Sequence, residues 1–351
     1  VGMLTDRYGP RKLMGYAVGL CALASIGFGM SDSMLTASIS RALIGVTVAF
    51  AFVGTLAIAG YWFKPAQYAM LAGVLQTVGM GGGIFGQAPL RAMVESIGWR
   101  GTMGFLAIIA VMLSVGILML VPRRSREQRE LEVRSSVMKG LHAVVANSQS
   151  WLCAMIGFGL AATMLGFGAL WGVPWLTSVQ GYTTTQAAGI TSMIFAGWAL
   201  FSPLLGWSSD HLGRRNIILT LGAILSLVAF SAVLFFTPES TAGLMLLLFL
   251  VGIGGSSMTV CFSSVKEHNS LGYASTSLGL MNMFVVGAGA VMQPLIGWLL
   301  DLNWDGTIAD GARIYAADAY TLAFCSLLAA NLLALIATLL LKETRCKQIV
   351  A

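Results

Sequence analysis

The chain has 351 residues, of which 57% are hydrophobic and only 10% are charged, and its mean hydropathy is +0.83. A soluble domain of this size could not expose so apolar a surface, so the composition excludes one and indicates a protein embedded in a lipid bilayer. The net charge of +6 comes from basic residues in short segments between apolar runs. These residues form no continuous basic stripe, which argues against a nucleic-acid partner.

The chain opens on a short polar motif that recurs half a protein later. Gly, Asp, Gly and a basic residue stand at positions 2, 6, 9 and 11 and again at positions 206, 210, 213 and 215. With the arginines beside them, the two copies comprise Gly2, Asp6, Arg7, Gly9 and Arg11, and Gly206, Asp210, Gly213, Arg214 and Arg215. Such a repeat predicts two parallel halves.

Ten apolar runs are long enough to cross about 30 Å of hydrocarbon as helices, which requires roughly 20 residues each. The predicted spans are 13–30, 34–62, 68–95, 102–122, 151–178, 186–208, 215–236, 242–264, 274–300 and 317–341. The second copy of the motif follows the second span of the later half. We therefore expect helix 1 and most of helix 2 to lie before Gly2, which gives twelve spans in the intact protein.

A second set of positions supports the duplication. Pro, Trp and Gly at positions 89, 99 and 101 recur at the same spacing at 294, 304 and 306, which pairs helix 5 with helix 11. The expected fold is thus an all-α membrane protein of two six-helix halves. Its segments are the end of the first half (1–121), a linker (122–150), the second half (151–341) and a tail (342–351).

The basic residues indicate the orientation of the spans. Sixteen of the twenty lysines and arginines fall on the side of the bilayer that carries the Gly2 loop. The positive-inside rule places this side, and both termini, in the cytoplasm. The linker contains a mixed-charge run at 123–132, which could form an amphipathic helix on the membrane surface or a solvated connector.

These features resemble the major facilitator superfamily. The first copy of the motif, with Leu4 and Lys12, is similar to that family's signature loop between helices 2 and 3. The segment 41–45 resembles its helix 4 motif R-x-x-Q-G, with Ile44 in place of Gln. The resemblance covers the whole chain and implies a monomeric, multi-pass transporter, here expected in a bacterial inner membrane. It leaves the substrate undefined.

The chemistry of the loops suggests a breakable latch between the halves. The glycines permit a helix end to approach a neighbour closely, and each Asp can accept backbone N–H groups at a facing helix N-terminus. The arginines can pair with these carboxylates. In the resembling family this contact holds the cytoplasmic side closed. The alternative is that the charges only fix topology, above all in the second copy, where His211 replaces a basic residue.

Polar and aromatic residues within the spans are candidates for a central binding cavity. Arg41 and Arg91 are the charged residues inside or at the edge of spans, and each could bind a carboxylate or snorkel to the interface. Paired amides and two tryptophans could line the same cavity, or simply pack. These candidates are Gln76, Gln87, Asn282, Gln293, Trp171 and Trp198.

The pattern therefore predicts a secondary active transporter that works by alternating access. Because the embedded charges are positive, we expect import of a small organic anion or zwitterion, with protons as the coupling ion by analogy with the family. Drug or siderophore export and a transporter-like receptor stay as alternatives, although the segment 86–89 lacks the Gly-Pro dipeptide of the antiporter motif. No catalytic constellation, metal-ligand spacing or cofactor motif is visible, so we expect neither an enzyme nor a cofactor.

Overall fold

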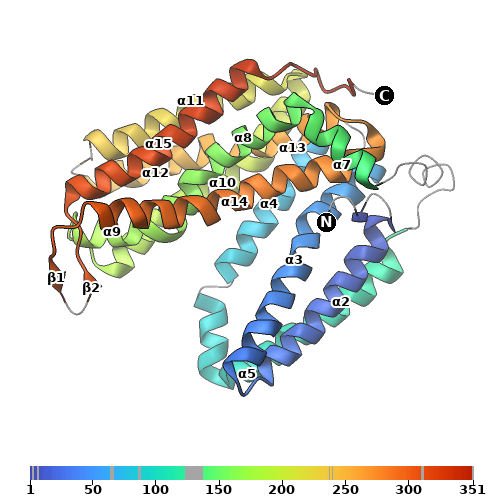
Figure 1. The fold of residues 1–351 in the computed structure, drawn as a ribbon, viewed down its shortest axis with the longest axis horizontal. Helices are drawn as coiled ribbons and strands as arrows, with labels where there is room; N and C mark the ends of the chain where they lie inside the picture. The colour runs from blue at the N-terminus through green and yellow to red at the C-terminus, as the bar shows by residue number, and fades with distance from the viewer. Residues whose placement is uncertain are drawn as a thin grey trace.

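The computed structural model describes residues 1–351 apart from 2–3, 6–7, 64–66, 86–87, 123–136, 237, 239, 310–311 and 350–351. It is built almost entirely of long helices, arranged in two groups that converge at one end and diverge at the other (Figure 1). The mixed-charge run of the linker lies outside the described residues, so its conformation stays a prediction.

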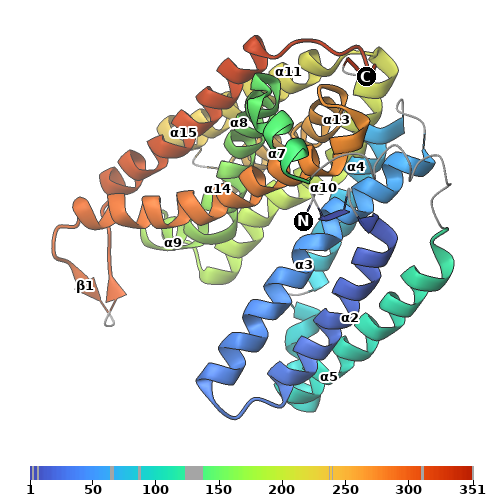
Figure 2. The ribbon, with the colours of Figure 1, turned by 45° about the vertical axis from the view of Figure 1, so that its right-hand side comes forward.

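The first group contains the helices that precede the linker. They are α2 (Pro10–Gly29), α3 (Met34–Trp62), α4 (Tyr68–Phe85) and α5 (Ala88–Leu120). Within α5 the chain changes direction at Gly98, which has φ of 74° and ψ of 161°, a backbone conformation that glycine adopts at little cost. In the turned view, α2, α3 and α5 stand together as a layered group apart from the later helices (Figure 2).

The second group follows the linker helix α7 (Val137–Ala146). Its first span is α8 (Ser148–Thr163), continued by the π-helix η2 (Met164–Trp171) and α9 (Gly172–Ser178). The rest comprises α10 (Thr184–Leu212), α11 (Arg215–Phe236), α12 (Thr241–Ser256), α13 (Thr259–Glu267), η3 (Leu271–Tyr273), α14 (Ala274–Leu302) and α15 (Ala317–Leu340), with the antiparallel strands β1 (Ile308–Ala309) and β2 (Ala312–Arg313) between the last two helices.

Nine helices in the described part of the chain are long and apolar enough to cross a membrane. They correspond to nine of the ten predicted spans. The predicted span 68–95 is divided between α4 and the first turns of α5, with residues 86–87 outside the described part. The helical membrane fold is confirmed.

Close helix packing in the second group depends on glycine, as is usual where lipid supplies no hydrophobic driving force between helices. A Cβ atom on Gly197 of α10 would lie 2.3 Å from the carbonyl oxygen of Phe249, and one on Gly252 of α12 would lie 2.1 Å from that of Ile194. In the same group, the ring of Phe167 packs edge-on against three other aromatic rings at centroid distances of 5.2–5.7 Å. These rings belong to Trp175, Phe230 and Phe324.

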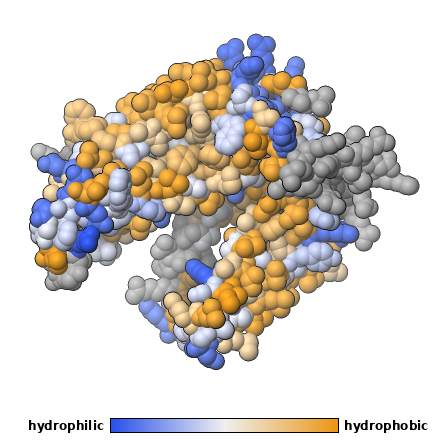
Figure 3. Space-filling model, viewed as in Figure 1, coloured by the Kyte–Doolittle hydropathy of each residue, from blue (hydrophilic) through white to orange (hydrophobic). Residues whose placement is uncertain are grey.

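The two ends of the molecule differ in charge and in openness. At one end, which we call the basic end, lie the start of α11, the end of α13 and the C-terminal tail; at the other, the hairpin end, lie β1 and β2 (Figure 1). The surface is hollowed between the two groups, and this cleft opens toward the hairpin end (Figure 3). At the basic end the groups are in contact.

Candidate functional site: the closed seam at the basic end

The first part of the seam joins α4 of the first group to α10 of the second through glycine. A Cβ atom on Gly206 would lie 2.3 Å from the carbonyl oxygen of Ala69, and one on Gly73 would lie 2.3 Å from that of Ser202. Real Cβ atoms do not approach so closely, so the two backbones touch only because both positions are glycine. Gly206 thus lies at a close approach between the two groups, and its role in gating stays a prediction.

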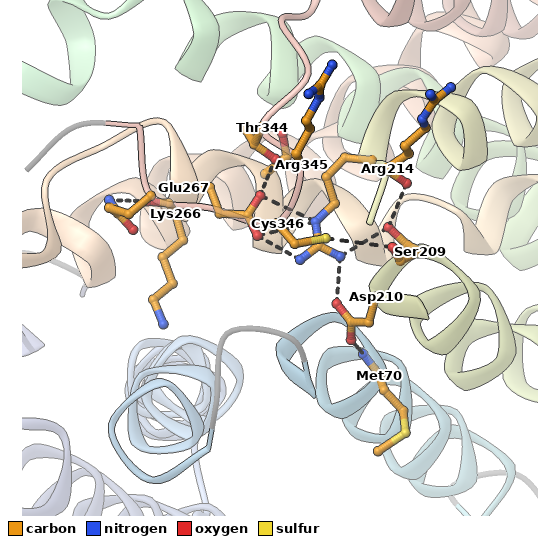
Figure 4. Close-up of polar contacts among 12 residues, drawn as sticks. Met70, Ser209, Asp210, Arg214, Lys266, Glu267, Thr344, Arg345 and Cys346 are labelled. Carbon is orange, nitrogen blue, oxygen red and sulfur yellow. Dashed lines mark hydrogen bonds and ion pairs between the residues drawn. The ribbon is translucent and has the colours of Figure 1, made fainter. Parts of the chain in front are cut away.

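Asp210 closes this seam by binding the beginning of α4. Its Oδ2 atom accepts a hydrogen bond of 3.1 Å from the backbone N–H of Met70, in the first turn of that helix. The N-terminus of a helix carries unpaired N–H groups and a partial positive charge, and a carboxylate satisfies both. Asp210 thus makes the contact with a facing helix that its position in the motif predicts, across the two groups (Figure 4).

Arg215 holds the carboxylate of Asp210 in place. Its Nη1 atom lies 2.7 Å from Asp210 Oδ1, and its Nη2 atom lies 2.6 Å from Oε1 of Glu267 at the end of α13. Nη1 also donates to the hydroxyl of Ser209 over 3.1 Å. The Arg215 side chain is fully buried, so its charge depends on these two carboxylates for compensation. The sequence predicted the pair with Asp210 and missed Glu267.

The C-terminal tail completes the cluster. Glu343 accepts hydrogen bonds of 2.9 Å from the backbone N–H groups of Arg215 and Asn216, which begin α11. Burial opposes ionisation of Glu343, but these backbone donors outweigh it and lower the pKa of the carboxyl group. The hydroxyl of Thr344 donates to Glu267. No spacing in the sequence links either residue to the motif, since each partner comes from a distant element.

Farther along the seam, a hydrogen bond forms at a carbonyl oxygen that a proline in α10 leaves without its usual donor. Pro203 has no N–H, so the carbonyl oxygen of Ala199 one turn earlier lacks its usual donor within the helix. Thr77 of α4 supplies one, because its hydroxyl donates to Ala199 over 2.6 Å. This bond joins the two groups one helical turn beyond Gly73.

The first copy of the motif is described only in part. Gly9 has φ of 86° and precedes Pro10 at the start of α2, which is a favoured position for proline. Arg11 donates to the carbonyl oxygen of Leu118 at the end of α5, within its own group. The expected pairing of Arg11 with a motif carboxylate stays a prediction. Gly2, Asp6 and Arg7 lie outside the described residues.

Two of the predicted cavity residues meet between η2 and α14. The indole N–H of Trp171 donates to the carbonyl oxygen of Gln293 over 3.0 Å, and the Gln293 amide donates to that of Leu165 over 2.9 Å. Each of these two hydrogen bonds has one partner in the π-helix η2, namely Trp171 or Leu165. A π-helix is a wide helical turn that is frequent at functional sites. Gln76 of α4 and Asn282 of α14 are partly buried.

The remaining candidates are separated. Arg41 is exposed on α3, where its guanidinium carbon lies 6.0 Å from the centre of the Phe28 ring. Trp198 is only 1% exposed and lies against Gly255 in the core of the second group, so it does not line the cleft as the sequence suggested. Aromatic residues in a span pack in the core more readily than they form a cavity wall. Gln87 and the side chain of Arg91 lie outside the described part.

Comparison with known proteins identifies the family. A sequence profile of the Major Facilitator Superfamily matches residues 1–294. The chain belongs to this superfamily. The fold agrees, because the Escherichia coli fucose:proton symporter FucP superposes with a TM-score of 0.74 at 12% identity, over 97% of this chain and 86% of that chain. A bacterial homologue of the iron transporter ferroportin in an outward-facing state superposes with a TM-score of 0.68 at 13% identity, over 97% and 85%.

Curated proteins with related sequences are named as probable transporters. The probable transporter MCH2 of Saccharomyces cerevisiae is 30% identical over 53% of this chain and 38% of its own length. The probable sulfoacetate transporter SauU of Cupriavidus necator is 21% identical over 86% and 74%. The probable nitrate/nitrite transporter NarK2 of Mycobacterium tuberculosis is 27% identical over 72% and 64%. The chain thus spans less than two thirds of two of these relatives.

The family points to a transporter and not to an enzyme. The multiple spanning helices of this chain make the protein an integral, multi-pass membrane protein. Within the described residues, no group of three or more His, Cys, Asp or Glu side chains could hold a metal ion.

Proposed function

We propose that this protein is a secondary active transporter of a small anion, and that the described conformation is closed at the basic end and open at the hairpin end. The observation that carries the proposal is the seam of Asp210, Arg215 and α4, which joins the two groups at one end while the cleft opens at the other. The basic end lies in the cytoplasm in this proposal, as the distribution of Lys and Arg indicates.

The anionic substrate is supported by two observations. Arg41 is a cation within α3, an apolar helix long enough to cross the membrane, where a charge is costly unless it serves a purpose. Relatives are named for transport of sulfoacetate, of nitrate and nitrite, and of anions. We further propose that uptake is driven by protons, in keeping with the fucose:proton symporter that shares the fold.

Transport in proteoliposomes tests this proposal. The full-length protein should accumulate labelled sulfoacetate or nitrate when the lumen is alkaline, and a protonophore should abolish the accumulation. Neutral fucose, supplied at the same concentration, is the control for selectivity. Transport of fucose without either anion would overturn the substrate class, and anion accumulation that survives the protonophore would overturn the coupling.

A further inference from the structure

A second part of the seam joins α13 to the first group through side chains. Phe262 and Lys266 are four residues apart on α13, so they share one face of the helix. Phe262 packs edge-on against Phe52 of α3 at a centroid distance of 4.9 Å. Lys266 reaches the same group one turn nearer the end of α13. These two layers lie where α13 closes against α3 and α4.

The ammonium group of Lys266 occupies a slot made by the first group. Its Nζ atom lies 4.1 Å from the centre of the Tyr68 ring, and a Cβ atom on Gly60 would come within 2.6 Å of it. The ring is held in position because Tyr68 is only 2% exposed and its hydroxyl donates to the carbonyl oxygen of Leu56 over 3.1 Å. The side chain points toward the helices of the first group (Figure 4).

The neighbouring carboxylate is already engaged. Glu267 follows Lys266 in sequence, but its oxygens bind Arg215 and Thr344 on the other side of α13. The described partner of the ammonium is thus the face of an aromatic ring, which attracts a cation through its quadrupole and carries no net charge. Separation of α13 from α4 would therefore leave the positive charge of Lys266 in the opening between the groups.

We propose that Lys266 is an anion-binding residue on the release side of the transport path. When the basic end opens, Lys266 leaves the Tyr68 ring and binds the carboxylate, sulfonate or nitrate group of the substrate as it passes the Phe52–Phe262 layer. When the basic end closes, the ammonium group of Lys266 returns to the face of the Tyr68 ring, so the ring and the anion compete for the same positive charge. This inference rests on the proposed anion transport and adds to it a site from which the anion is released into the cytoplasm.

Measurements from each side of the membrane test the inference. Whole cells present the hairpin end to the medium, and inside-out vesicles present the basic end. For labelled sulfoacetate or nitrate, Lys266→Met should raise the half-saturating concentration at the basic end by ~10-fold, the loss of one charge-assisted contact, and change it less than ~2-fold at the hairpin end. Lys266→Arg should keep the value of the unaltered protein at both ends.

A substitution of Tyr68 tests the inference independently of Lys266. Tyr68→Leu removes the competing face, so it should lower the half-saturating concentration at the basic end by ~3-fold or more, on the scale of an exposed cation–π contact. An unchanged value at the basic end in both Lys266→Met and Tyr68→Leu, or equal changes at both ends, would overturn the release site. If Lys266→Met does not fold, Tyr68→Leu decides alone. Failure of the unaltered protein to move either anion would overturn the proposed function instead.

Discussion

The seam at the basic end has two parts that are built differently. Between α4 and α10 each contact includes backbone atoms of at least one helix: Gly206 touches the backbone of Ala69, and the carboxylate of Asp210 accepts from the backbone N–H of Met70. Between α13 and the first group the contacts are made by side chains that can rotate, the rings of Phe52 and Phe262 and the ammonium of Lys266. The first part fixes how the two groups fit when closed, and in the proposed transport cycle the second rearranges while a solute passes.

The largest expected effect is on the buried charge cluster. Arg215→Met leaves two carboxylates without their cation, and breaking a buried ion pair in this way costs about 3–5 kcal/mol. Thermal unfolding in detergent measures the loss. Arg214→Met is the matched control, because this neighbouring arginine is exposed, and it should leave the midpoint unchanged. Equal midpoints for the two variants would contradict the role given to Arg215.

Backbone contact in the first part of the seam is tested at Gly206. Gly206→Val places carbon atoms where the backbone of Ala69 now lies, so the basic end cannot close, and we expect roughly a 100-fold loss of transport because backbone cannot move aside. Gly189→Val in the same helix is the control, since a Cβ atom there meets nothing within 4 Å. Full transport by Gly206→Val would show that this contact is dispensable.

Thr77 offers a finer test of the same seam. Thr77→Val should destabilise the closed conformation by about 1 kcal/mol, the usual net value of one hydrogen bond. Pro203→Ala restores an N–H for the carbonyl of Ala199, so Thr77→Val should cost less when it is made in that background. The coupling between the two substitutions, measured by unfolding of all four proteins, checks the account. Strict additivity would mean that Thr77 does not serve the carbonyl freed by Pro203.

The smallest effect concerns the tail. The pKa of Glu343 is lower in the folded protein than its ordinary value of 4.5. Glu343 therefore adds stability that is fully present when the pH is above 4.5 and is lost as the pH falls through the lowered pKa. Thermal midpoints should therefore fall as the pH drops below about 4.5, and the fall should be shallower in Glu343→Gln. Identical slopes for the two proteins would show that the backbone contacts of Glu343 do not stabilise its charge.

The sequence predicted the parts of this account that depend on local pattern. Apolar run length gave the helices, and the repeated motif identified Gly206 and Asp210 as contact residues. It could not identify Glu267, Glu343 or Thr77, because their partners come from elements far away in the chain. Burial is equally non-local: Trp198 lies in an apolar span as the other cavity candidates do, and only the packing shows that it is buried in the core. Pro203 shows where a carbonyl is freed, but only the packing of α4 shows what donates to it.

The proposed transport cycle requires the basic end and the hairpin end to open in turn. In a variant without the native cysteines, spin labels at the exposed positions Trp62 and Leu271 report on the basic end, and labels at Met34 and Ile308 report on the hairpin end. Asp210→Ala removes the contact with Met70. We predict that it lengthens the distance between the first pair and shortens the distance between the second. Unchanged distances, or a change of the same sign in both pairs, would contradict the account.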